Sequence, residues 1–361
     1  MPGTCTGKLT QGSGGAAVFP AYAAVDLGTH NCRLLIGSPG TDGSVAVLDA
    51  LARPVRLGEG LASTGRLGDP GMQRAIDALD RCARRIARRR VCATRAVATE
   101  ACRRATNAAE FLARVRAACG LAVEPISARE ESRLTLAGCA GLMEPGHHPV
   151  LLFDIGGGST EVVWADRRSR HNPAPLACLS LPTGVVDLTE RYGSDRIDEA
   201  SFSRMVDAAH AALARFDAAY GIAETIAAGR VQMIGTSGTV TTLAAVSLGI
   251  GRYRRTKVDG TVIAFDEIAR LTGSLARTDW QTRAAIPSVG PARADLVVAG
   301  CAILTAICRL WPVGRVTVAD RGLREGLILA MHEARTARGL STHTPTDTPT
   351  GTPADTGLAP G

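Results

Sequence analysis

Two carboxylates flank a run of three glycines near the middle of the chain. Asp154 ends an apolar stretch, Gly156–Gly158 follow, and Glu161 leads into a second apolar stretch. Consecutive glycines allow backbone N–H groups to approach an anion closely, and carboxylate oxygens suit a hard cation. A plain β-hairpin needs only one or two glycines. The stretch therefore favours a phosphate-binding loop over a simple hairpin turn.

The same order of residues occurs roughly 128 positions earlier. Asp26 ends an apolar run, Gly28–Asn31 form a polar turn, and residues 34–36 are apolar again. An internal repeat of this kind indicates two related halves. We expect each half to contribute one phosphate loop to a shared cleft.

Two further stretches could carry chemistry. Glu130 and Glu131 open a predicted helix just before the second glycine loop, where acids either stabilise a helix N-terminus or act in catalysis. Residues 235–242 form a loop of glycines and hydroxyls, in which anion binding and plain helix capping are equally favoured. This loop has no lysine of the Walker type, so a P-loop nucleotidase is not indicated.

Alternating strand and helix signals must position these residues. Strands are predicted at 21–27, 34–36 and 45–55 in meander order, and Asn107 is expected to cap a helix. Residues 292–310 predict a long buried helix. Further strands are predicted at 94–99, 121–126, 178–182, 231–234 and 316–319, with helices at 72–86, 202–220 and from 322 to about 335.

Composition sets the broad class. The 361 residues have room for two domains, and 45 % hydrophobic with 21 % charged residues is typical of a globular protein. The formal charge of +7 suits polyanions in general. No apolar run is long enough for a membrane span, and no signal pattern opens the chain, so a cytoplasmic protein is expected. The ten cysteines lack C-x-x-C pairs and predict buried reduced thiols, notably Cys32, Cys102, Cys139, Cys301 and Cys308.

Five arginines lie at 84–90, near the end of the predicted helix at 72–86. Because no aromatic residues are interleaved for base stacking, we favour a solvated helix face over a nucleic-acid site. A homodimer that joins two clefts would also account for this basic face.

Taken together, the motifs of residues 20–336 resemble those of the Ppx/GppA family, the exopolyphosphatases and guanosine pentaphosphate phosphatases. The matching stretches are AAVDLGTHNCRLLIG, AVATEACRRATNAAEFL, ISAREESRL, FDIGGGSTEVVW, LPTGVVDLTERY, GTSGTVTTLAA and ADRGLREGL.

The resemblance implies an α/β fold: two ribonuclease-H-like domains of the actin, sugar-kinase and heat-shock-chaperone superfamily around a central cleft. Domain I is predicted at 20–128 with the C-terminal helix 322–336, and domain II at 129–321. Residues 1–19 and 337–361 are Gly-, Thr- and Pro-rich and predict disordered ends. The chain resembles a short, two-domain form of the family.

The resemblance also implies roles for individual residues. Glu131 would be the general base, with a one-position error towards Glu130 left open. Asp154 and Glu161 would hold Mg²⁺ or another divalent cation. The phosphate-binding residues would be Gly28, Thr29, His30, Asn31, Arg103, Gly156, Gly157, Gly158 and Ser159.

One residue departs from the family pattern. His30 stands where the family usually has Asn, and Asn31 follows it. A protonated histidine would donate from both ring nitrogens and make phosphate binding pH-sensitive; Asn31 could instead take over the role, or the change could be neutral.

The resemblance implies hydrolysis of a terminal phosphoanhydride bond. Inorganic polyphosphate is the first expected substrate, because only 4 % of residues are aromatic and could stack a guanine. Guanosine pentaphosphate is the alternative, and a slow sensor of guanosine tetraphosphate or polyphosphate is a second one. A sugar-type kinase is disfavoured because no sugar-binding signature is present, and neither nucleic acid nor membrane is expected as a partner.

Overall fold

The computed structural model describes residues 20–146, 148–166 and 173–339. The predicted disordered ends at 1–19 and 340–361 lie outside these residues. The last helix, however, runs to Ala337, the residue at which the tail was predicted to begin.

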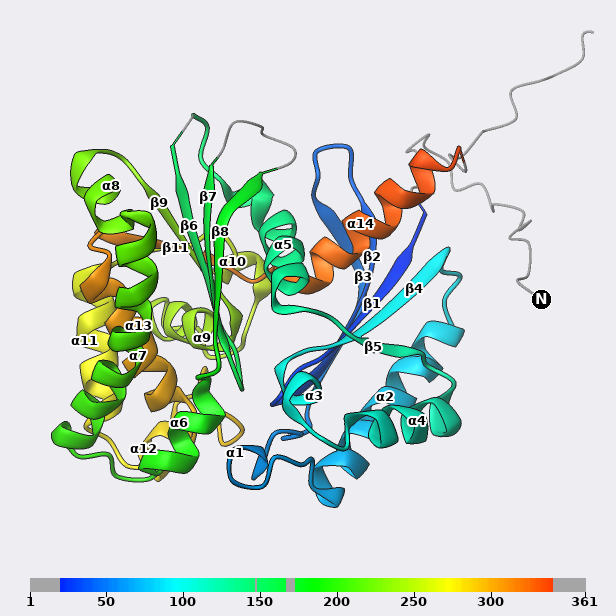
Figure 1. Ribbon diagram of the computed structural model, residues 1–361, viewed down its shortest axis with the longest axis horizontal. Coiled ribbons are helices and arrows are strands. Elements are labelled where there is room, and N and C mark those ends of the chain that lie inside the picture. The colour runs from blue at the N-terminus through cyan, green and yellow to red at the C-terminus, as the bar shows by residue number, and fades with distance from the viewer. Residues whose placement is uncertain (1–19, 147, 167–172, 340–361) are drawn as a thin grey trace, which may run out of the picture.

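Two mixed sheets form the framework (Figure 1). The first has the order β3-β2-β1-β4-β5 and the second β10-β11-β9-β6-β7-β8. Read from β8, the second sheet repeats the order of the first and adds β10 at its edge. The strands are β1 (Tyr22–Leu27), β2 (Asn31–Pro39), β3 (Val45–Pro54), β4 (Ala93–Ala98), β5 (Val123–Pro125), β6 (Val150–Ile155), β7 (Thr160–Asp166), β8 (Ala174–Leu181), β9 (Gln232–Thr236), β10 (Val262–Ala264) and β11 (Arg315–Ala319).

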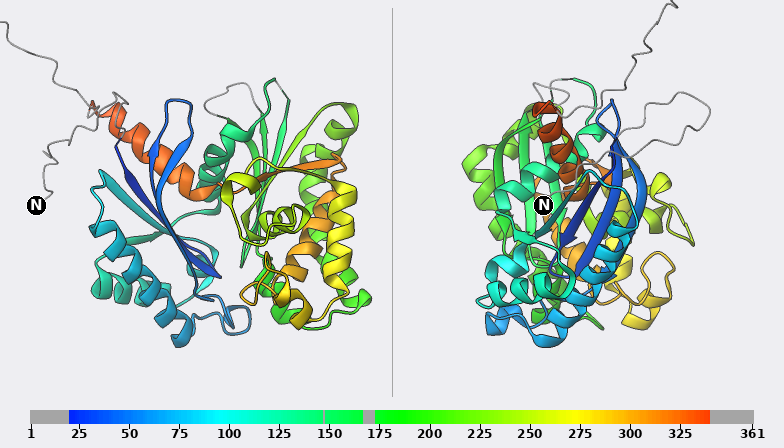
Figure 2. Two further views of the ribbon diagram at one scale, coloured as in Figure 1. Left: turned by 180° about the vertical axis from the view of Figure 1, so that it is seen from behind. Right: turned by 90° about the vertical axis from the view of Figure 1, so that its right-hand side faces the viewer.

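Helices cover the outer face of each sheet and fill the space between the sheets (Figures 1 and 2). They are α1 (Leu61–Thr64), α2 (Asp69–Ala87), α3 (Glu100–Arg104), α4 (Ala108–Cys119), α5 (Ala128–Cys139), α6 (Val185–Tyr192), α7 (Glu199–Tyr220), α8 (Ile222–Ala228), α9 (Ser237–Ser247), α10 (Arg255–Val258), α11 (Phe265–Ala276), α12 (Trp280–Ala285), α13 (Val297–Leu310) and α14 (Leu323–Ala337), with the short η1 (Ala140–Leu142) after α5. This α/β arrangement of two ribonuclease-H-like units confirms the expected fold.

Alternation along β1 shows why both faces of the first sheet are covered. Ala23 and Val25 pack against α2 and α4, whereas Tyr22 and Ala24 pack against α14. All four residues are fully buried. A strand buried on both faces needs a continuous apolar run, which residues 22–25 supply.

Helices α5 and α14 meet in the layer between the two sheets (Figure 1). They cross at glycines: a methyl group at Gly326 would overlap the backbone of Leu134, and one at Gly138 would overlap the carbonyl of Gly322. Leu134 of α5 packs towards the first sheet, whereas Leu136 packs towards the second. This close crossing ties both sheets to one helix pair.

The two β-hairpins predicted from the internal repeat are present and share a geometry. In the first, Gly28 N donates to Asn31 O at 2.9 Å, and in the second Gly156 N donates to Ser159 O at 2.9 Å. Asp26 stands opposite Arg33 across β1 and β2. At the corresponding place on β6 and β7, Asp154 stands opposite Glu161.

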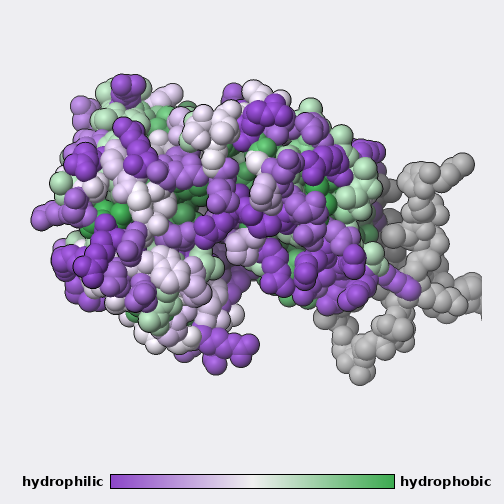
Figure 3. All heavy atoms as spheres, turned by 90° about the horizontal axis from the view of Figure 1, so that it is seen from below, coloured by the Kyte–Doolittle hydropathy of each residue, from purple (hydrophilic) through white to green (hydrophobic). Residues whose placement is uncertain are grey.

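The surface and the thiols can be compared with the expectations from composition. Hydrophilic residues dominate the face seen from below (Figure 3). None of the helices in the described residues is long and apolar enough to cross a membrane. Of the five thiols predicted to be buried, Cys32, Cys102, Cys139 and Cys301 are buried and Cys308 is half-buried, all as free cysteines.

Candidate functional site

A cavity of about 370 Å³ lies where the two hairpins, the start of α5, the start of α9 and the start of α14 come together. Both hairpin turns line it, as do Glu131, Asp154 and Glu161. Glu131 follows Asn31, the last residue of the first turn, by 100 positions, and Asp154 and Glu161 lie further along the chain. The fold therefore brings together residues that are far apart in the sequence. All the predicted site residues except Arg103 line this cavity.

The two glycine turns touch each other. A methyl group built on Gly157 would lie 3.0 Å from the backbone N of His30, and one on Gly158 would lie 2.5 Å from Thr29 Oγ1. The glycines are therefore needed for close contact between the turns as well as for access to a ligand. The backbone N–H groups of Thr29, His30, Gly157 and Gly158 donate to no acceptor within the described residues, which leaves them available for an anion.

The loop after β9 is a third wall of the cavity. Residues Ser237–Thr239 begin α9 and line the cavity with the free N–H end of that helix. Ser237 has a φ of 80°, a left-handed conformation that is strained for a residue other than glycine. Its hydroxyl hydrogen-bonds to Asp154. Of the two interpretations held open for this loop, the geometry supports an anion-facing helix N-terminus.

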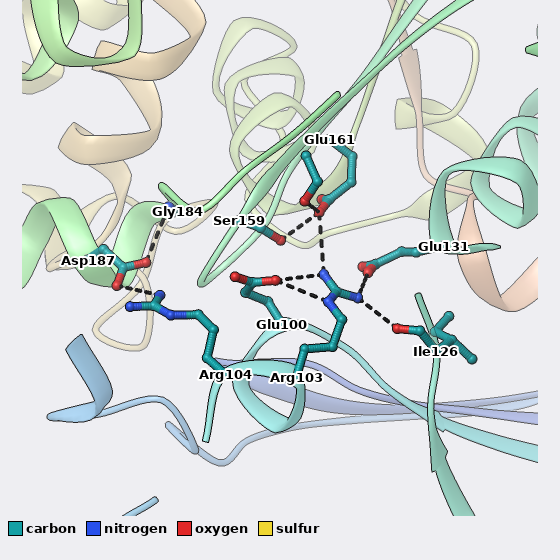
Figure 4. A network of polar contacts seen from close by, with 10 residues as sticks. Glu100, Arg103, Arg104, Ile126, Glu131, Ser159, Glu161, Gly184 and Asp187 are labelled. Carbon is teal, nitrogen blue, oxygen red and sulfur yellow. Dashed lines mark hydrogen bonds and ion pairs between the residues drawn. The ribbon is translucent and has the colours of Figure 1, made fainter. Parts of the chain in front are cut away.

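Arg103 joins Glu131 to two further acids (Figure 4). Its Nη1 donates to Glu131 Oε2 at 2.6 Å and to Ile126 O at 3.1 Å. Its Nη2 donates to Glu100 Oε2 at 2.8 Å and lies 3.9 Å from Glu161 Oε1. The residue predicted to face a phosphate chain thus lies one contact behind the cavity and holds Glu131 in place.

The acids of the site are buried in a way that disfavours their charge. Burial and the charge of Glu161 raise the pKa of Glu131 well above its usual range, and Arg103 opposes this rise. Burial raises the pKa of Asp154 to about 6, against the opposing charge of Arg33. Burial and then the charge of Asp154 raise the pKa of Glu161 to about 7. Such acids gain from a cation and can act as bases near neutral pH.

A divalent cation fits this set of donors. Asp154 and Glu161 are cross-strand neighbours that offer only oxygen, and Glu161 already accepts hydrogen bonds from Ser159 and Ser180 at 2.6 and 3.0 Å. Across the part of the chain that the structure describes, no three acid, histidine or cysteine side chains form a ready-made cluster. Mg²⁺ suits such a site, because it commonly takes one or two carboxylates and completes its shell with waters and substrate phosphates.

Three arginines of the cavity lining have no carboxylate partner. Arg33, Arg293 and Arg324 line the cavity, and none of them forms an ion pair within the described residues. Arg293 donates only to Thr242 Oγ1, at 2.6 Å. Unpaired guanidinium groups beside free N–H groups form a site for a multiply charged anion.

Sequence reasoning missed these arginines and Asp26, which also lines the cavity. Asp26 and Arg33 stand at the same offset as Asp154 and Glu161 in the repeated hairpins. A residue-by-residue superposition of the two hairpin sequences would have found both of them. Arg293 has no such local signal.

His30 is not the pH-sensitive donor that the sequence suggested. It is 8 % exposed. Burial, with the charge of Arg56 beside it, lowers the pKa of His30 to about 4. The imidazole is therefore neutral near pH 7. The backbone carbonyl of His30 accepts hydrogen bonds from Val55 N and Arg56 N. The residue helps to fix the first turn rather than supply a positive charge.

Replacing His30 by asparagine should leave the pH dependence of phosphate binding unchanged above pH 6. The variant should differ from the wild type in how much folding stability it loses at acid pH. Because the pKa of His30 is about 4 when folded and about 6.5 when unfolded, the wild type loses stability as pH falls through this window, by up to about 3 kcal/mol. The measurement is urea unfolding at pH 7 and pH 4, with His210→Asn on α7 as control. Equal acid losses in wild type and His30→Asn would contradict the assignment.

The basic run at 84–90 lies at the end of α2, outside the cavity lining. Arg88, Arg89 and Arg90 are exposed. Arg84 pairs with Asp80 at 2.7 Å, and Arg85 pairs with Asp49 at 2.6 Å. These features agree with the predicted solvated helix face.

Comparison with known proteins matches most of this chain to one family. The model of the Ppx/GppA phosphatase family matches residues 39–334. A "Guanosine-5'-triphosphate,3'-diphosphate pyrophosphatase" of Photobacterium profundum is 29 % identical, with the alignment covering 95 % of this chain and 65 % of the relative. An enzyme of the same name from Aeromonas salmonicida is 29 % identical, with coverage of 86 % and 59 %. The chain thus spans less than two thirds of these relatives.

Solved structures match over nearly their whole length. The Aquifex aeolicus member of the Ppx/GppA family is 30 % identical, with a TM-score of 0.71 and coverage of 88 % of this chain and 98 % of that one. An "Exopolyphosphatase" from Cytophaga hutchinsonii is 25 % identical, with a TM-score of 0.76 and coverage of 87 % and 98 %.

Proposed function

The chain belongs to the Ppx/GppA phosphatase family, and from this premise we propose that it hydrolyses the terminal phosphoanhydride bond of guanosine 5'-triphosphate 3'-diphosphate. The observation that carries the proposal is the meeting of Glu131, Asp154 and Glu161 with two glycine turns in one cavity. These groups supply a base, a cation site and anion donors, which are the parts that phosphoryl transfer to water requires.

Glu131 is the base in this proposal. Its raised pKa makes the carboxylate a better proton acceptor than an exposed one. Arg103 orients it through the hydrogen bond between Nη1 and Oε2. A water between Glu131 and the terminal phosphorus would lose its proton to Oε1 or Oε2 as it attacks, and the shortened substrate would leave with the bridging oxygen.

The glycine turns and arginines hold the phosphates. Free N–H groups of Thr29, His30, Gly157 and Gly158 bind equatorial oxygens, and charge that develops on them is stabilised without reorganisation. Mg²⁺ held by Asp154 and Glu161 would supply further charge neutralisation when bound. Arg33, Arg293 and Arg324 accommodate the remaining phosphates of a heavily charged substrate.

The preference for a guanosine substrate differs from the first expectation from sequence. The curated relatives named above are guanosine pyrophosphatases. The cavity lining includes an aromatic ring, Tyr253, and the apolar Leu296 and Val297, which could receive a base. The low aromatic content therefore does not exclude nucleoside binding, because one well-placed ring is enough to stack a base.

Inorganic polyphosphate is the second candidate. The Cytophaga hutchinsonii structure, named an exopolyphosphatase, is covered over 98 % of its length by this chain. The guanosine pyrophosphatases are covered over 59–65 % only. A linear phosphate chain would use the same turns and base and leave the wall at Tyr253 empty.

One experiment separates the candidates. Phosphate release with Mg²⁺ is measured in parallel from guanosine pentaphosphate, polyphosphate and ATP, and the proposal expects the highest kcat/KM for the first. A Tyr253→Ala variant should raise KM for the guanosine substrate and leave polyphosphate unaffected. Higher kcat/KM for polyphosphate would make it the substrate, and tight binding without release from any of the three would support the sensor.

Removal of the cation should abolish phosphate release and lower thermal stability together. A cation that is present at a free concentration of 100 times its dissociation constant stabilises the folded state by about 2.7 kcal/mol. The measurement is thermal unfolding of the wild type, Asp154→Asn and Asp80→Asn with and without Mg²⁺. Asp80 pairs with Arg84 on α2, and neither residue lines the cavity, so this variant should keep the Mg²⁺-induced shift that Asp154→Asn loses. An undiminished shift in Asp154→Asn would place the cation elsewhere.

A further inference from the structure

A second cavity of about 340 Å³ lies between the first turns of α5 and the edge strand β8. The helix and the strand run beside each other near the centre of Figure 1. The lining includes Arg129, Ser132, Cys178 and Ser180, together with the exposed Leu176 and Tyr220. None of these residues lines the main cavity, so this is a separate site.

Residues that line this cavity carry hydrogen-bond donors without an acceptor in the described chain. Helix α5 begins here, and its first N–H groups, those of Ala128 and Arg129, donate to no acceptor in the described chain, whereas Glu130 N donates to Ser127 Oγ at 3.1 Å. The Ser132 hydroxyl is one turn along the same helix. Ser132 is 1 % exposed, and its Oγ meets the geometric criteria for a hydrogen bond with no group among the described residues.

A buried hydroxyl without a partner is costly, and Ser132 therefore points to an occupant with acceptor oxygens. The Cys178 thiol lies beside Ser132. Burial raises the pKa of that thiol and the Ser132 hydroxyl acts to lower it, but the sulfur of a neutral thiol is only a weak hydrogen-bond acceptor. Arg129 adds a positive charge. No carboxylate within the residues described offsets it, because Arg129 forms no ion pair there. Helix N-terminus, guanidinium and hydroxyl together match a small oxyanion.

The nearby acids do not oppose such a ligand. Glu130 accepts from Arg133 Nε at 3.0 Å and from Arg95 Nη1 at 3.3 Å. Glu131 is held by Arg103 on the opposite side of the helix start. The Ser180 hydroxyl donates to Glu161 at 3.0 Å. Each carboxylate is thus already engaged, and Arg129 is left as the charge without a counter-ion.

We infer that this second cavity binds inorganic phosphate, at a site made by the N-terminus of α5, Arg129 and Ser132. The identity of the anion rests on the proposed function, because orthophosphate is the product of that reaction; the site itself rests on the donors alone. Ser132 follows Glu131 in the chain, and Ser180 contacts Glu161. Bound phosphate would therefore contact α5 on the side away from the main cavity and slow turnover without occupying the substrate cavity.

The test is calorimetric titration of the full chain with inorganic phosphate. The variants Ser132→Val and Arg129→Gln should each raise the dissociation constant of phosphate at the second cavity at least tenfold. Arg33→Ala should keep that event, because it alters only the main cavity, and Arg215→Gln on α7 is the matched surface control. Arg129 is exposed, so its variant keeps the test decisive if Ser132→Val does not fold. Unchanged phosphate binding in Arg129→Gln, or loss of all binding in Arg33→Ala, would overturn the inference.

A second measurement connects the site with catalysis. Phosphate should inhibit the wild type with a noncompetitive component, which Arg129→Gln should lose while its basal kcat and KM stay unchanged. Purely competitive inhibition of the wild type would overturn the coupling to Glu131. The binding titration needs no turnover. A chain that binds phosphate in this pattern but hydrolyses no substrate would refute the proposed function and leave the phosphate site standing.

Discussion

Replacing Glu131 by glutamine should lower kcat by roughly 10²–10⁴-fold, the usual contribution of a general base, and leave substrate binding intact. The amide has the size of the carboxylate and can still accept from Arg103, whose Nη1 lies 2.6 Å from Glu131 Oε2. It also removes a buried charge that burial disfavours, so stability should not fall. The measurement is steady-state phosphate release together with urea unfolding.

Glu130→Gln is the matched control for this prediction. Glu130 is next in the chain but points to Arg133 and Arg95 rather than into the cavity. Its replacement should leave kcat close to that of the wild type. If Glu130→Gln proved the inactive variant and Glu131→Gln the active one, the base would be misassigned by one position.

Replacing Gly326 by alanine should cause the largest loss of stability. The added methyl group would overlap the backbone of Leu134 on α5, and backbone cannot move aside as a side chain can. Overpacking costs typically about 1–3 kcal/mol and occasionally more, and we expect the upper part of this range. Helix α5 carries Glu131, and α14 carries Arg324 in its first turn. Separation of the helices should therefore also lower kcat. Urea unfolding and phosphate release measure the two effects.

Gly251→Ala is the control for the helix crossing, because a methyl group there meets nothing within 4 Å. It should change neither stability nor rate. A Gly326→Ala variant as stable as Gly251→Ala would show that the two helices can part at little cost. The crossing would then not be the rigid connection between the sheets.

The sequence predicted the elements whose signals are local. The hairpins at Asp26 and Asp154 are confirmed because each is set by an apolar run, a short polar turn and a second apolar run. The meander of the first three strands was expected from the sequence and is confirmed, whereas the remaining strand order of the two sheets was not predicted. The pairing of β1 with β4 across the 65 residues from 28 to 92 has no local signal, since it depends on how α2 packs.

Long-range contacts explain the misses. Asn107 occupies the N-cap position of α4 as predicted, but its side chain makes no capping hydrogen bond and instead binds the backbone N and O of Leu67 at 2.8 and 3.0 Å. The helix predicted from residue 292 begins at Val297, because residues 291–296 form turns that bring Arg293 to the cavity. Arg103 was expected at the phosphates, and only the folded chain brings Glu100 and Glu131 to it.

The two hairpins differ in the charge that each presents to the cavity. Asp26 faces an arginine across its strand pair, whereas Asp154 faces a glutamate at the same register. The charges of the first pair offset each other, whereas the second pair is negative whenever either acid is ionised. The second turn would therefore depend on a bound cation to accept a phosphate group beside it, and the first turn would not. Exchange of a single charge is thus enough to make one of two duplicated hairpins dependent on metal.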